Sequence, residues 1–220
     1  MDLQEKRNQE FWAKEVVQAN LIWPDEFVIR FVKRNFRNIA DTVVLDYGCG
    51  AGRNAIALAK EGYKVIAMDY SQEAISLVEQ KKEDLEITTV CNDGVEVPLA
   101  EQSVDAIIAD GSLFCSTLEN TTKILKELGK CMKPNAKFWA NWRSKEDSLY
   151  GKGMHLDDGL YCLDATTKRE GCSYLFVDEA MVRQMFEEAG LVLESLEQYY
   201  YTENNGQNRC AYYHTVAVKK

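Results

Sequence analysis

Short apolar runs alternate with amphipathic stretches through most of the chain. The runs at 42–47, 63–69 and 104–110 are rich in Val, Ile and Ala. Continuous apolar runs of this length are typical of parallel strands that are buried on both faces. Helical patterns come between them, so we expect a parallel sheet with right-handed crossovers. Strands are expected at 42–47, 63–69, 86–91, 104–110 and 136–142, and helices at about 52–61, 71–82 and 118–132.

The pattern changes near the C-terminus. Residues 178–190 have a helical period that ends at Gly190, and two long strand-like runs follow, at about 191–201 and 208–218. Asn205-Gly206 lies between these runs and is a strong signal for a tight turn. The sheet is therefore expected to end in an antiparallel hairpin.

Two segments lie outside the alternation. The first is residues 1–38, in which 2–19 are expected to be helical although weakly patterned and 25–37 show a clear amphipathic period. The whole of this segment is expected to form an N-terminal helical cap. The second, residues 144–173, lacks a period and is longer than an ordinary loop, so it is expected to be an inserted lid. We interpret 1–220 as one domain in which both segments close over a ligand.

Composition limits the function classes. The 220 residues are 46% hydrophobic, which is enough for one sizeable core. The formal net charge of -9 disfavours nucleic acid and anionic membranes as partners. Seven cysteines without a C-x-x-C pair indicate reduced thiols and a cytoplasmic protein, and no apolar run is long enough to cross a membrane.

The sequence D-x-G-x-G-x-G follows the first expected strand, with Asp46, Gly48, Gly50 and Gly52 at the fixed positions. A dinucleotide-binding loop would need a third glycine where Arg53 stands, and no Lys-Ser/Thr pair completes a phosphate loop. Glycines allow a ligand to approach the backbone, and the following helix offers free N–H groups. A small zwitterion with a carboxylate fits such a loop.

Four motifs in order resemble those of class I S-adenosylmethionine-dependent methyltransferases. They are VVLDYGCGAG at 43–52, VIAMDYS at 65–71, CNDGVEVPLAEQSVDAIIAD at 91–110 and LKELGKCMKPNAKFWAN at 125–141. The Gly-Arg-Asn at 52–54 is similar to the tellurite-resistance and ubiquinone-type small-molecule branches. The resemblance implies a Rossmann-like, doubly wound α/β fold. Its seven-stranded sheet would be mostly parallel, with an antiparallel strand in the C-terminal hairpin and helices on both faces.

The resemblance also implies S-adenosylmethionine as cofactor, with S-adenosylhomocysteine as product. Asp46 would orient the methionine end, and Asp69 would bind the ribose. Tyr70 would pack on the adenine, and Asp93 would accept its amino group. Asp110 would lie near the methyl group. The implied cofactor-binding residues are Asp46, Gly48, Gly50, Gly52, Asp69, Tyr70, Asp93, Gly94, Val95 and Asp110.

The expected reaction moves a methyl group to an O, N or S atom of a small molecule by in-line displacement. Two alternatives stay open: a methyltransferase that acts on a protein or RNA, and a non-catalytic module that binds S-adenosylmethionine. The chain is expected to be a monomer or a homodimer.

Aromatic side chains suit the walls of a pocket that holds a sulfonium cation. The expected walls of the acceptor pocket are Trp12, Trp23, Ser112, Phe114, Tyr150 and Tyr161. If the acceptor must lose a proton, His155 in the inserted segment is the first candidate for the base and Asp110 the second. His214 is expected to be packed within the last strand. No metal site is expected, because HLDDG at 155–159 resembles a solvated loop.

Overall fold

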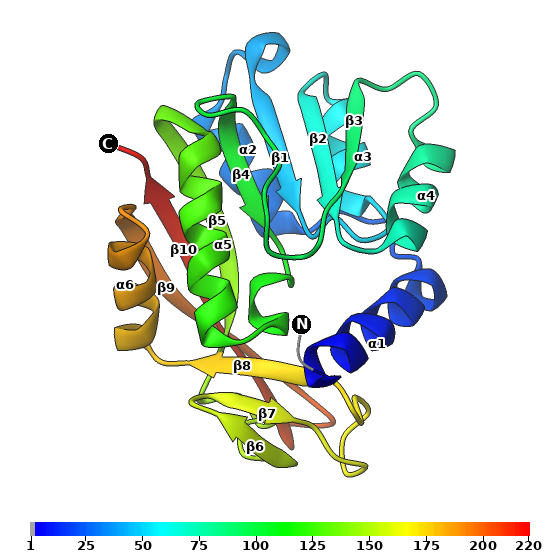
Figure 1. The fold of residues 1–220 in the computed structure, drawn as a ribbon, viewed down its shortest axis with the longest axis vertical. Coiled ribbons are helices and arrows are strands. Elements are labelled where there is room, and N and C mark those ends of the chain that lie inside the picture. Colours follow the sequence, from blue (N-terminus) through cyan, green and yellow to red (C-terminus); the bar gives the residue numbers. More distant parts are fainter. Residues whose placement is uncertain (1–2) are drawn as a thin grey trace.

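The computed structural model describes residues 3–220, in which one ten-stranded mixed sheet carries helices on both faces (Figure 1). The strands are β1 (Val43–Tyr47), β2 (Lys64–Asp69), β3 (Ile87–Cys91), β4 (Val104–Ala109), β5 (Met132–Ser144), β6 (Met154–Asp157), β7 (Leu160–Cys162), β8 (Ser173–Val177), β9 (Val192–Glu203) and β10 (Asn208–Val218). The α-helices are α1 (Leu3–Ala19), α2 (Glu26–Asn35), α3 (Arg53–Lys60), α4 (Gln72–Lys81), α5 (Leu118–Cys131) and α6 (Glu179–Glu188). Two 3₁₀ turns, η1 (Ile39–Asp41) and η2 (Leu113–Cys115), complete the description.

The main part of the sheet has the strand order β3-β2-β1-β4-β5-β10-β9. The first five strands are parallel, whereas β10 is antiparallel to both β5 and β9. The strand order reverses beside β1, so the carboxyl ends of β1 and β4 open a crevice, which is where open α/β sheets bind ligands. The predicted Rossmann-like sheet with an antiparallel C-terminal hairpin is confirmed.

The predicted number of seven strands was wrong, because the inserted segment adds strands to the same sheet. Strand β5 continues past the end of β4, and its last two residues, Arg143 and Ser144, pair with β8. Strands β7 and β6 follow as an antiparallel meander. Their short apolar runs were hidden in the sequence by the glycines and charged residues around them.

Alternate side chains of the central strands supply two cores, one on each face of the sheet. On β4, Ile107 packs into a core that contains Leu125 of α5 and Phe186 of α6. The next residue, Ile108, enters the opposite core with Val28 of α2 and residues of α3 and α4. The prediction of helices on both faces is confirmed.

Local signals fixed several element boundaries. The Ser71 hydroxyl accepts the Ala74 N–H at 3.1 Å and caps α4 as expected. Asn205 and Gly206 both have positive φ, at 55° and 85°, and turn the terminal hairpin. Within residues 3–220, none of the helices combines the length and apolar character that crossing a bilayer requires.

Candidate functional site

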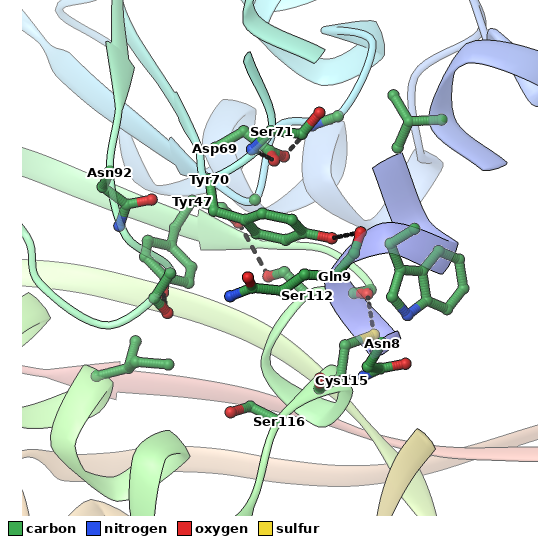
Figure 2. A pocket seen from close by; sticks show the side chains of 17 residues that line it. Asn8, Gln9, Tyr47, Asp69, Tyr70, Ser71, Asn92, Ser112, Cys115 and Ser116 are labelled. Carbon is green, nitrogen blue, oxygen red and sulfur yellow. Dashed lines mark hydrogen bonds between the residues drawn. The ribbon is translucent and has the colours of Figure 1, made fainter. Parts of the chain in front are cut away.

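A pocket opens at the carboxyl ends of β1, β2 and β4, where α1 lies across them (Figure 1). It encloses about 820 Å³ of empty space, the solvent at its mouth included. Figure 2 shows the 17 side chains around it, which come from α1, the glycine loop, the ends of β2 and β3, and the segment after β4.

The glycine loop approaches its neighbours too closely for other residues. Gly48 has φ of 72°, and a Cβ there would lie 2.3 Å from the Cβ of Ser112. Gly52, at φ of 83°, begins α3 without a side-chain cap. The helix therefore presents N–H groups and the positive end of its dipole on the side of the loop. Gly48 and Gly50 line the pocket.

Asp69 lies at the end of β2 and lines the pocket (Figure 2). Its Oδ2 accepts the Gly50 N–H and its Oδ1 accepts the Ser71 N–H, both at 2.9 Å. The residue is only 7% exposed, and burial raises the pKa of its carboxyl. Each carboxylate oxygen can accept a further hydrogen bond, so paired hydroxyl donors of a ligand would find two fixed acceptors here.

Two tyrosines frame the next part of the pocket. The Tyr70 hydroxyl donates to the Gln9 carbonyl of α1 at 3.2 Å, and the Tyr47 hydroxyl donates to the Gly94 carbonyl at 2.9 Å (Figure 2). A Cβ on Gly94 would lie 3.6 Å from the Cβ of Tyr70. Both tyrosines and Gly94 line this part of the pocket, together with the polar side chain of Asn92.

Asp93 and Val95 do not line the pocket. The Asp93 Oδ1 accepts the N–H groups of Val95 and Glu96 at 2.9 and 2.7 Å, which lowers the pKa of this exposed carboxyl. The side chain therefore holds the turn that brings Gly94 to the pocket. Val95 packs against the core. Sequence reasoning missed Asn92, because a single polar residue after a strand carries no distinctive spacing.

Asp46 lies behind the glycine loop and outside the pocket lining. It is 2% exposed, accepts the Ala55 N–H at 3.1 Å, and burial raises its pKa to about 8. Asp110 is also outside the lining, and Arg53 and Asn54 donate to its Oδ2 at 2.5 and 3.0 Å. Both carboxylates are thus engaged by groups of α3 in this structure.

The residues expected in the acceptor pocket are dispersed. Trp12 and Ser112 line the pocket, whereas Trp23 is 80% exposed and Phe114 is buried against Tyr174. Tyr150 and Tyr161 contact each other near the β6–β7 meander, with ring centroids 5.3 Å apart.

The expected base, His155, is exposed on β6 beside Tyr161. Residues 144–173 supply none of the pocket-lining side chains of the described chain. His214 is packed against Phe27, Trp139 and Tyr199.

Sequence reasoning named Trp12 on α1 but missed the other lining residues of this helix, among them Asn8 and Gln9. The Asn8 amide donates to the carbonyls of Cys115 and Ser173 at 2.6 and 3.1 Å, and its Oδ1 accepts the Ser173 N–H at 2.9 Å. Arg169 pairs with Glu15 on the same helix at 2.9 Å. The weak apolar period of α1 gave no signal for these polar contacts.

Comparison with known proteins identifies the part of the chain that builds most of this pocket. A family model described as "Methyltransferase domain" matches residues 44–135. Residues 44–135 are therefore similar to this family. The glycine loop, Asp69 and Gly111 of this chain are all within the matched range.

Two curated relatives are similar to parts of this chain. The cypemycin N-terminal methyltransferase of a Streptomyces species is 26% identical over 118 residues, which cover 53% of this chain and 47% of the relative. A probable S-adenosyl-L-methionine-dependent methyltransferase TehB of Haemophilus influenzae is 29% identical over 92 residues, 41% of this chain and 32% of the relative. The chain thus spans less than half the length of either relative.

Two solved structures show the fold over most of the chain. A SAM-dependent methyltransferase from Methanosarcina mazei superposes with a TM-score of 0.74 at 19% identity and covers 86% of this chain and 96% of its own. A 1,6-didemethyltoxoflavin-N1-methyltransferase from Burkholderia thailandensis, with S-adenosylhomocysteine bound, gives 0.66 at 18% identity, with 89% and 77% covered. The resemblance to class I S-adenosylmethionine-dependent methyltransferases is confirmed.

Proposed function

We propose that the chain is an enzyme that transfers the methyl group of S-adenosylmethionine to a small molecule. The observation that carries the proposal is the Asp69 carboxylate, held by the Gly50 and Ser71 N–H groups beside a glycine loop. A dihydroxylated ribose next to a zwitterionic amino acid has the shape and polarity that this arrangement fits. The solved relative from Burkholderia thailandensis contains S-adenosylhomocysteine, which is the product of such a reaction.

Each part of the pocket would then bind one part of the cofactor. The backbone of Gly48 and Gly50 and the start of α3 would bind the carboxylate of the methionine end. Asp69 would accept the two ribose hydroxyls, and Tyr70 and Gly94 would enclose the adenine. The segment at Gly111 would border the methyl group, because it lies at the end of β4 beside the glycine loop.

The chemistry is a single displacement. A lone pair on the acceptor atom forms a bond to the methyl carbon while the bond from carbon to sulfur breaks, and S-adenosylhomocysteine leaves. The protein aligns the two reactants and excludes water, and alignment alone can supply several kcal/mol of the barrier. Trp12 and Tyr70 line the pocket and offer ring faces that attract a sulfonium cation.

The acceptor is proposed to be a nucleophile that needs no protein base, such as a neutral amine or a thiol. The 17 lining residues in the described part of the chain include no His, Lys or Arg. His155 is on an exposed strand and Asp110 pairs with Arg53, so neither is placed to remove a proton within this pocket. The lining also offers no cation for an anionic acceptor.

A peptide amine is the alternative that one observation favours, because the relative from Streptomyces is named as an N-terminal methyltransferase. Helix α1 covers the pocket here, which favours a small acceptor over a folded protein. The formal charge of -9 argues against RNA. We also propose a cytoplasmic protein, from its free thiols, that acts as a monomer or homodimer.

Calorimetry with S-adenosylhomocysteine tests the proposal. A hydrogen bond to a charged group contributes roughly 1.5–3 kcal/mol, so Asp69→Ala should weaken binding about tenfold to a hundredfold. Asp84→Ala removes an exposed acid outside the pocket and should bind like the wild type. Tight binding of NAD with no binding of S-adenosylhomocysteine would refute the proposed cofactor. A mass-spectrometric screen of small amines and thiols then identifies the acceptor.

A further inference from the structure

A polar side chain outside the pocket fixes the segment that borders it. Asn141 lies on β5, next to the end of β4. Its Oδ1 accepts the Gly111 N–H at 2.7 Å, and its Nδ2 donates to the Asp110 Oδ1 at 2.9 Å. The partners determine which atom is oxygen, because an N–H must meet an acceptor and a carboxylate must meet a donor. One amide thus holds two successive residues.

The same carboxylate is also held from the other side. Arg53 and Asn54 donate to the Asp110 Oδ2, and both residues stand directly after Gly52 of the glycine loop. Asp110 therefore accepts hydrogen bonds from three side chains, and only 6% of its side chain is exposed. Through Asp110 the start of α3 is joined to β5.

The segment that these contacts hold lies directly against the glycine loop. Gly111 has φ of 75°, and a Cβ there would meet nothing within 4 Å. Its neighbour Ser112 touches the glycine loop closely, since a Cβ on Gly48 would lie 2.3 Å from the Ser112 Cβ. The Ser112 hydroxyl also donates to the Tyr47 carbonyl at 2.9 Å. A shift of Gly111 and Ser112 would therefore change the wall of the pocket and its glycine loop together.

We propose that Asn141 is a positioning residue that holds Gly111 and Ser112 against the bound cofactor, directly through the Gly111 N–H and also through Asp110. Neither Asn141 nor Asp110 lines the pocket, so both act through their neighbours. The inference rests on the proposed function only in naming the ligand. Hydrogen bonds connect Arg53 to Asp110 and Asp110 to Asn141. Binding of the cofactor at the glycine loop should therefore depend on the position of Gly111 and Ser112.

Exchanging the two side chains tests the proposal. Asn141→Asp places a second carboxylate against Asp110, and Asp110→Asn removes the charge that pairs with Arg53. In the double variant, an amide at 110 can donate to a carboxylate at 141, which can still accept the Gly111 N–H. The double variant also has the composition and charge of the wild type. Asn204→Asp in the exposed hairpin turn is the matched control for the added charge.

The single variants should each bind S-adenosylhomocysteine on the order of tenfold more weakly, which corresponds to one or two lost hydrogen bonds. The double variant should recover to within about threefold of the wild type, which is a coupling that a double-mutant cycle measures. Two adjacent carboxylates share a proton, so the binding defect of Asn141→Asp should diminish as the pH is lowered from 8 to 5. A general loss of packing would give neither recovery nor this pH dependence.

Wild-type affinity in Asn141→Asp at pH 8, or a double variant no better than the single ones, overturns the proposal. Failure of the wild type to bind S-adenosylhomocysteine overturns the proposed function instead. Exchange of the Gly111 amide hydrogen, measured without ligand, still decides the role of Asn141 in that case. It should be faster in Asn141→Ala, which lacks the acceptor of this N–H, than in the wild type and in Asn204→Ala, and equal rates would refute the proposal.

Discussion

Helix α1 and the β6–β7 meander share two sequence features but have different positions relative to the pocket. Both lie in segments outside the strand and helix alternation, and both segments contain aromatic residues that suit a pocket wall. In the structure α1 lies across the strand ends and contributes four lining residues, among them Asn8 and Trp12. The meander extends the sheet at its far edge and contributes none of the described lining.

The difference shows that aromatic content does not mark a lid. The aromatic residues near the meander contact one another, with Tyr161 packing against Tyr150, His155 and Phe176. Helix α1 is joined to the body by the packing of Phe11 and Trp12 against the core and by polar groups, of which the Asn8 amide makes three hydrogen bonds. Because α1 supplies side chains that line the pocket, it is the segment whose docking ligand binding should affect.

Hydrogen exchange should separate the two segments most strongly. Opening of α1 removes part of the pocket, so ligand at about 100 times its dissociation constant should slow exchange of α1 amides by up to about a hundredfold. Amides of β6 and β7 should exchange at the same rate with and without S-adenosylhomocysteine. Equal protection of both segments would show that the meander also closes on the ligand.

Removing the polar contacts of α1 should have the next largest effect. Asn8→Leu leaves the buried N–H and carbonyl of Ser173 without this partner and should weaken binding of S-adenosylhomocysteine by about tenfold. Calorimetry measures the change, and Asn38→Ala, at an exposed position distant from the pocket, serves as control. Unchanged affinity in Asn8→Leu would mean that α1 is held by its other contacts alone.

Changes in the meander should have the smallest effect. A general base typically raises the rate of a reaction about 10²–10⁴-fold. Because His155 is exposed and outside the pocket lining, His155→Gln should keep kcat within about threefold of the wild type at every pH. Tyr161→Ala should bind S-adenosylhomocysteine within about twofold of the wild type, although lost ring contacts lower its melting temperature. A large loss of kcat with a changed pH profile in His155→Gln would restore His155 as the base.

Patterns within a few residues predicted the central elements of this fold. The apolar runs of β1, β2 and β4 appear where the sequence placed them, and Ser71 caps α4 as expected. The glycine loop and Asp69 could also be located, because a tight turn at a strand end needs glycines and only certain residue types can serve there. Positions such as Asn92 and Asn8 have no spacing that distinguishes them from ordinary surface residues.

The sequence by itself therefore determined the order of the central strands and helices, the antiparallel ending and the composition of the glycine loop, because each depends on local conformational preference or periodic burial. Only the tertiary structure decided which carboxylates face the ligand. Asp69 lines the pocket, whereas Asp46 and Asp110 accept hydrogen bonds from α3 outside its lining. It also decided that α1, and not the inserted segment, covers the site. Both outcomes depend on contacts between residues far apart in the chain, such as that of Asn8 with Ser173, and no local pattern encodes these.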